Sequence, residues 1–217
     1  GASNTALGSL ALNLNTTGIS NTAVGKSALG ANTTANANTA VGYNSLTANT
    51  TGTENTAVGT EALNATITGS YNTAVGRSAL LLTTGDHNTA VGRIALRTNS
   101  SGANNTALGS RSMYSNSSGG NNTAVGVNAL DANTTASNNT AIGYRAGTTT
   151  TTGADNVAVG SDALFANTTG ASNVAIGHDA LGENTTASNN TAVGMSALVA
   201  NTTGTGNSAV GRSALGA

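Results

Sequence analysis

The chain has 217 residues, of which only 7% are charged and 2% aromatic, and its formal net charge is −1. An ordinary globular domain has about 25% charged residues and a core of large apolar side chains, so this composition excludes a conventional core. The near-neutral charge gives no electrostatic basis for binding nucleic acid or an anionic membrane. The sequence contains no apolar run of about 18 residues, so no insertion into a membrane is predicted.

One motif, Asn-Thr-Ala-Val-Gly with close variants, recurs along the whole chain. Its copies are 17 residues apart, except that the interval from Asn72 to Asn88 is 16. Numbered from the Asn, the 17-residue unit is N-T-A-V-G-x-x-A-L-x-x-N-T-T-G-x-x. No linker or composition shift interrupts it, so residues 1–217 are predicted to form a single repeat array, and the lack of an initiator Met suggests a fragment of a longer protein. The thirteen units begin at Asn4, Asn21, Asn38, Asn55, Asn72, Asn88, Asn105, Asn122, Asn139, Asn156, Asn173, Asn190 and Asn207.

The first element of each unit is a short β-branched segment, Thr5–Leu7 in the first copy, which ends at an invariant glycine. Such segments favour strands over helices, and helical repeats need about 33 residues or more. The fold class predicted is all-β: a parallel β-solenoid of about thirteen coils, each with two short strands and two turns. Coils stacked about 4.8 Å apart would give a rod about 60 Å long.

Charged and aromatic residues are confined to six positions of the unit. They fall at positions 6, 7, 10, 11, 16 and 17, and none falls at positions 1 to 5, 8, 9 or 12 to 15. The variable positions therefore predict two exposed corners, and the constant positions predict the packed part of the coil.

Side-chain alternation then predicts directions within the strand. If Val24 points into the coil, Thr22 does too, and Ala23 and Gly25 face outward. An exposed strip that never varies is expected to be covered by other copies of the chain. The predicted inter-chain strip is Ala6, Ala23, Ala40, Ala57, Ala74, Ala90, Ala107, Ala124, Ala141, Ala158, Ala175, Ala192 and Ala209.

Two segments carry a family resemblance. Asn-Val-Ala-Val-Gly at 156–160 and Asn-Val-Ala-Ile-Gly at 173–177 resemble the head repeat of trimeric autotransporter adhesins. The whole unit also resembles repeats in phage-type tail fibres and in bacterial fibre proteins that end in an endosialidase-type chaperone domain. The resemblance implies a left-handed β-roll and a homotrimer with the alanine near the shared axis. The adhesin repeat is typically shorter than the 17 residues found here.

Several motifs that suggest chemistry have a simpler structural interpretation. Nine Asn-Thr-Thr or Asn-Ser-Ser triplets are formal glycosylation sequons, but they recur at position 12 of the unit, where stacked Asn side chains can form ladders. His87 and His178 have no Cys or second His nearby in the sequence, and Asp162 and Asp179 are expected to form a solvated acidic corner. We predict no enzyme activity, no cofactor and no metal.

The function expected is that of a structural fibre shaft or adhesin head segment, extracellular on a cell surface or a virion fibre, which contributes to attachment to a cell-surface or host receptor. Two alternatives remain open: an ice-binding solenoid that uses an Asn/Thr face at positions 12 and 14, and a self-associating extracellular filament or matrix protein. The candidate surface contacts are Tyr43, Tyr114, Tyr144, Phe165, Arg93 and Arg97.

The short unit at Asn72–His87 lacks the Asn of position 12. A local irregularity in the rod is expected there, such as a shifted turn, and a regular ladder through that coil would contradict this expectation.

Overall fold

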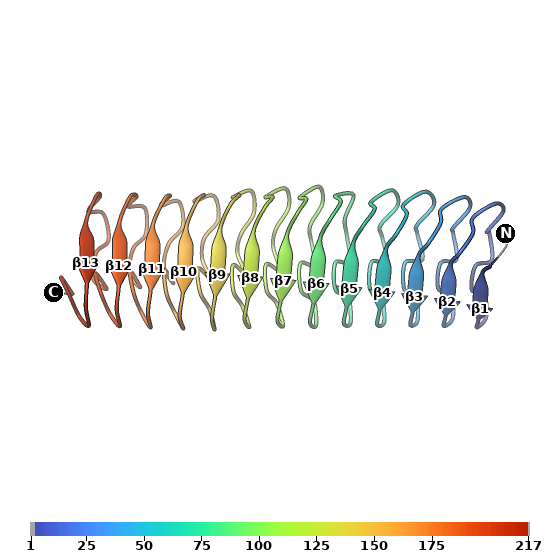
Figure 1. Cartoon of the computed structure of the whole chain (residues 1–217), viewed down its shortest axis with the longest axis horizontal. Coiled ribbons are helices and arrows are strands. Elements are labelled where there is room, and N and C mark those ends of the chain that lie inside the picture. Colours follow the sequence, from blue (N-terminus) through green and yellow to red (C-terminus); the bar gives the residue numbers. More distant parts are fainter. Residues whose placement is uncertain (1–2, 217) are drawn as a thin grey trace.

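The computed structural model describes residues 3–216, which form a rod of stacked coils with the two ends of the chain at opposite ends of the rod (Figure 1). Each coil contributes one strand to a single sheet in which neighbours in the sequence are neighbours in space. All pairs are parallel, with each Thr, Ala and Val opposite its counterpart. The strands are β1 (Thr5–Leu7), β2 (Thr22–Val24), β3 (Thr39–Val41), β4 (Thr56–Val58), β5 (Thr73–Val75), β6 (Thr89–Val91), β7 (Thr106–Leu108), β8 (Thr123–Val125), β9 (Thr140–Ile142), β10 (Val157–Val159), β11 (Val174–Ile176), β12 (Thr191–Val193) and β13 (Ser208–Val210).

The parallel β-solenoid is confirmed, but each coil has one strand and not the two that were predicted. The rest of the coil is made of turns, because residues at positions 7, 9 and 17 have positive φ even where they are not glycine. These turns still bond to both neighbouring coils. Glu61 N–H donates to the Tyr43 carbonyl of the coil before (2.9 Å), and Leu63 N–H donates to the Ala79 carbonyl of the coil after (3.1 Å).

The interior of each coil is filled by the alanines of positions 3 and 8 and the leucine of position 9. The predicted orientation of the strand is therefore wrong: Ala23 is fully buried within its own chain, while Thr22 and Val24 lie on the outside. A coil with a single short strand is too narrow to hold both a Val and a Leu, so the small side chain faces the leucine. The alanines from Ala23 to Ala209 are covered by their own chain and cannot form an inter-chain strip, and Ala6, in the first coil, is exposed.

Buried asparagines at position 1 link every coil to the next. The Oδ1 of Asn21 accepts the backbone N–H of Asn38 (2.9 Å), and its Nδ2 donates to the Ala35 carbonyl of its own coil (2.8 Å). The same link between coils, from one Oδ1 to the next backbone N–H, continues from Asn4 to Asn207 without a gap. This ladder satisfies polar groups that would otherwise be buried without partners.

A second ladder is formed by the asparagines of the sequons. Asn32 Nδ2 donates to Asn15 Oδ1 (2.8 Å) and to the Ala35 carbonyl (3.1 Å). From Asn32 to Asn184 these side chains are fully buried, which leaves no room for a glycan. Thr66, Thr83 and Thr150 replace Asn in this ladder, and the Oδ1 atoms of Asn49 and Asn133, which precede Thr66 and Thr150, have no partner within the described chain.

Completing the second ladder should stabilise the protein. In Thr150→Asn, the new Nδ2 can donate to the unpartnered Asn133 Oδ1, and the new Oδ1 can accept from Asn167 Nδ2, which bonds only the Gly170 carbonyl. We expect the free energy of unfolding to rise by about 1 kcal/mol, measured by urea denaturation. The exposed Thr152→Asn is the matched control and should change it by less than about 0.5 kcal/mol. A destabilised Thr150→Asn would show that the ladder geometry cannot accept a side chain there.

The short coil has the altered turn that was expected, but the strand ladder and the position 1 asparagine ladder run through it without a break. β5 and β6 pair in regular register, and Asn88 N–H reaches Asn72 Oδ1 at 2.9 Å. The missing residue is absorbed at one corner, where Thr83 replaces Asn. Its hydroxyl accepts the Gly85 N–H two residues on (3.0 Å), whereas an Asn at this position reaches the carbonyl three residues on. Only this turn is altered.

Candidate functional site

Positions 2 and 4 of the unit form a flat, uncharged surface, here named the Thr/Val face, which is the outer surface of the sheet. Position 2 is Thr, Val or Ser and position 4 is Val, Leu or Ile in every coil. Side chains two residues apart in a strand point the same way, so the face presents one row of each kind along the rod. The second row includes large apolar residues that remain partly exposed, such as Val91 (38%) and Ile142 (41%).

The hydroxyl groups of this face differ in their hydrogen bonding from the hydroxyl groups of position 13. At position 13, Thr134 Oγ1 donates to the Thr151 carbonyl (3.0 Å) and Thr168 Oγ1 donates to the Thr185 carbonyl (3.0 Å). Within residues 3–216 the position 2 threonines, Thr22 among them, make no such side-chain bond, so their hydroxyls are available to water or to a partner. The Asn/Thr face considered for ice binding does not exist as predicted, because its asparagines are in the interior.

A second surface, here named the polar edge, is formed by positions 6, 7 and 10. Position 7 of one coil lies beside position 10 of the same coil and of the next: the Arg111 guanidinium carbon is 4.5 Å from the centre of the Tyr114 ring, and Arg111 Nη2 is 2.9 Å from Asp131 Oδ2. The structure thus brings together residues that appear scattered in the sequence.

All six candidate contact residues lie on the polar edge. Five of them fall in the stretch of coils from Arg93 to Phe165, and the sixth, Tyr43, lies further towards the N-terminus, with Lys26 Nζ 5.9 Å from its ring centre. Sequence reasoning did not single out Arg111 and Arg145, which contact the predicted aromatic residues. The sequence shows that Arg111 and Arg145 both occupy position 7 of the unit, but it does not show that position 7 lies beside position 10 in space.

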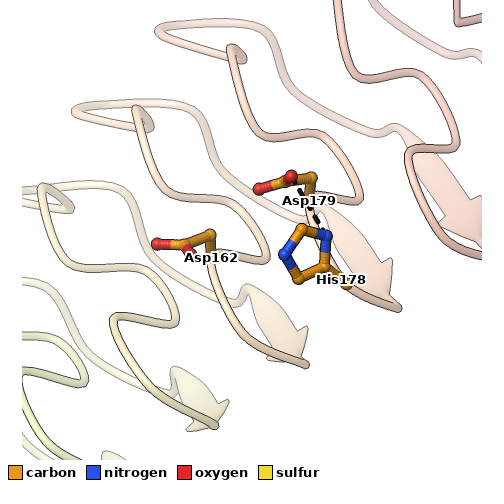
Figure 2. Close-up of side chains that lie close together, drawn as sticks. All are labelled: Asp162, His178 and Asp179. Carbon is orange, nitrogen blue, oxygen red and sulfur yellow. Dashed lines mark ion pairs between the residues drawn. The ribbon is translucent and has the colours of Figure 1, made fainter.

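Further along the polar edge, three titratable side chains meet. Asp162 and Asp179 occupy position 7 in neighbouring coils, and His178 precedes Asp179 (Figure 2). His178 Nδ1 is 3.0 Å from Asp179 Oδ2, and one ligand atom from each of the three residues lies within 4.8 Å of the others. The prediction that the two aspartates share a corner is confirmed, whereas His178 is less isolated than the sequence indicated.

Arg145 completes this group of charges. Its Nε lies 2.6 Å from Asp162 Oδ1, and its guanidinium carbon is 4.5 Å from the centre of the Phe165 ring. The hydrogen bond that it donates to Asp162 raises the pKa of Arg145 above its ordinary value. A surface hollow of about 380 Å³ adjoins Asp162, Asp179 and Phe165.

The chemistry of this corner is limited by its surroundings. One imidazole and two carboxylates are ligand types that Zn²⁺ accepts, but Arg145 already neutralises Asp162, and His178 remains 55% exposed. The other histidine, His87, stacks on Tyr71 of the preceding coil with ring centres 4.8 Å apart.

No protein-family model matches this chain, and no curated protein matches it. In residues 3–216 there is no helix with the length and apolar character needed to cross a membrane.

Proposed function

We propose that this chain is a structural segment of an extracellular fibre, which acts as a stiff spacer and contributes to attachment at a cell or virion surface. The observation that carries the proposal is the unbroken rod itself: thirteen strands in a single register, linked by a continuous asparagine ladder. Such a rod places its two ends about 60 Å apart. Force along the rod would be shared between backbone bonds and the continuous row of position 1 amides, with the interrupted second row of amides adding to them.

The same rod suits assembly with identical copies. We propose a homotrimer in which three left-handed rods bury their Thr/Val faces against one another. This face is uncharged along the whole described rod, and its partly exposed Val, Leu and Ile residues would gain from burial. The proposal replaces the alanine strip with the Thr/Val face as the contact between chains, because the alanines are inside each coil.

The solution mass of the fragment tests this assembly. We expect light scattering after size exclusion to give about three times the chain mass of 20.8 kDa. A triple variant, Val58→Lys, Val91→Lys and Val125→Lys, places charges on the Thr/Val face and should reduce the mass to that of one chain, since buried unpaired charges cost several kcal/mol each.

The matched control carries the same added charge on the polar edge. Thr60→Lys, Ser110→Lys and Val127→Lys all occupy position 6, and this variant should keep the mass of the unmodified protein. A folded monomer in the unmodified protein would contradict the trimer, and a thermal-hysteresis assay would then test whether the free hydroxyl row orders ice. A mass that rises continuously with concentration would indicate a self-associating filament.

A further inference from the structure

The positive charge of the chain is concentrated on one part of the polar edge. Four of the seven Lys and Arg residues, here named the arginine patch, belong to three consecutive coils: Arg77, Arg93, Arg97 and Arg111. Arg77 and Arg93 occupy position 6 in neighbouring coils, whose strands pair in register just before them, Val75 opposite Val91. Backbone atoms of neighbouring strands are about 4.8 Å apart, so the two side chains leave the rod side by side.

Little within the chain neutralises the patch. Among the described residues its only ion pair is the one between Arg111 and Asp131 (2.9 Å), so three of its four guanidinium groups have no carboxylate partner. Two like charges about 4 Å apart in water repel by about 1 kcal/mol. An anion that lies across the patch would remove this repulsion and would satisfy guanidinium donors that face solvent.

Tyr114 holds part of the patch in place. Arg97 Nη1 donates to its hydroxyl at 3.3 Å, and the guanidinium carbons of Arg97 and Arg111 lie 5.9 Å and 4.5 Å from the ring centre. These contacts hold two guanidinium groups from neighbouring coils close together. A ligand that binds them therefore has less side-chain entropy to remove. The same contacts also engage the Tyr114 ring beside the patch, so this ring is not free to stack on a nucleic-acid base.

We propose that the arginine patch binds an acidic polysaccharide with sulfate or carboxylate groups that runs along the rod. Guanidinium groups bind such oxyanions through paired N–H donors. Positive groups repeated at the coil spacing match a polymer whose anionic groups also repeat along an extended chain. This inference goes beyond the fibre function, and it would hold for a monomeric rod as well.

Binding of heparin, hyaluronan and neutral dextran to the whole 217-residue chain tests the proposal. We expect heparin to bind, dextran not to bind, and the heparin affinity to fall as salt rises to about 0.15 M, because exposed charges are screened. The triple variant Arg77→Gln, Arg93→Gln and Arg97→Gln should weaken heparin binding by about tenfold or more.

The control variant removes the same number of positive charges elsewhere: Lys26→Gln, Arg145→Gln and Arg212→Gln. It should retain most of the affinity, and circular dichroism should show both variants folded. An equal loss in the two variants would overturn the patch in favour of a net-charge effect, and no heparin binding at low salt would overturn the proposal outright. Tighter binding to single-stranded oligothymidine than to heparin would overturn the assignment to a polysaccharide.

Discussion

Gly59→Ala is expected to prevent normal stacking of the coils and to lower the free energy of unfolding by more than about 4 kcal/mol, a loss seen for only a few kinds of substitution. Gly59 has a φ of 132°, which L residues rarely adopt. A Cβ built on it would lie 2.7 Å from both the carbonyl carbon and the carbonyl oxygen of Gly76 in the next coil. Neither atom can move away, because both belong to backbone fixed by the sheet.

The control for this substitution is Gly30→Ala. Position 10 accepts side chains as different as Thr, Asn, Asp, Leu, Val, Arg, Tyr and Phe in other coils, and a Cβ on Gly30 would come no closer than 3.3 Å to its nearest neighbour, the Ser27 carbonyl oxygen. We expect a change of less than about 1 kcal/mol in the same urea titration. If Gly59→Ala were as stable as Gly30→Ala, the tight stacking at position 5 would not be a requirement of the fold.

Asn122→Ala should break the first asparagine ladder at the middle of the rod. Asn122 is 1% exposed; its Oδ1 accepts the Asn139 N–H (2.9 Å), and its Nδ2 donates to the Ala136 carbonyl (2.9 Å). Without the amide, the Asn139 N–H is left buried and unpartnered, while the Ala136 carbonyl keeps the hydrogen bond that it accepts from Asn133 Nδ2 (3.1 Å). An unpartnered buried group costs about 1–3 kcal/mol and a lost hydrogen bond about 1 kcal/mol, so the free energy of unfolding should fall by roughly 2–4 kcal/mol.

The substitution Asn122→Ala should also affect one part of the rod more than the rest. Each coil contacts only its neighbours, so the loss should loosen the step between β8 and β9 first. Hydrogen exchange should therefore show faster exchange of the Asn139 amide, with smaller changes at the far ends. The exposed Asn13→Ala serves as the comparison and should leave exchange in the rod unchanged. Continued protection of the Asn139 amide in Asn122→Ala would contradict the role given to the ladder.

The candidate surfaces could be predicted only in part. The variable positions of the unit correctly located the exposed corners, and Arg93, Arg97 and Tyr114 were recognised as surface residues. Their grouping with Arg111 and Asp131 could not be derived, because it depends on how the turn folds positions 7 and 10 together. That turn relies on positive φ at Leu-bearing positions such as Leu63, which ordinary residue preferences do not indicate.

The sequence by itself determined the repeat, the coil length, the strand at Thr-Ala-Val and the separation of constant from variable positions, because periodicity is a property of the sequence. Only the tertiary structure decided which side of the strand is inside. Alternation defines two faces but does not choose between them, and Val is the more apolar candidate for a core. The narrow coil reverses that choice: with Leu63 already filling the interior, there is space for Ala57 but not for Val58, and so the larger side chains form the outer face.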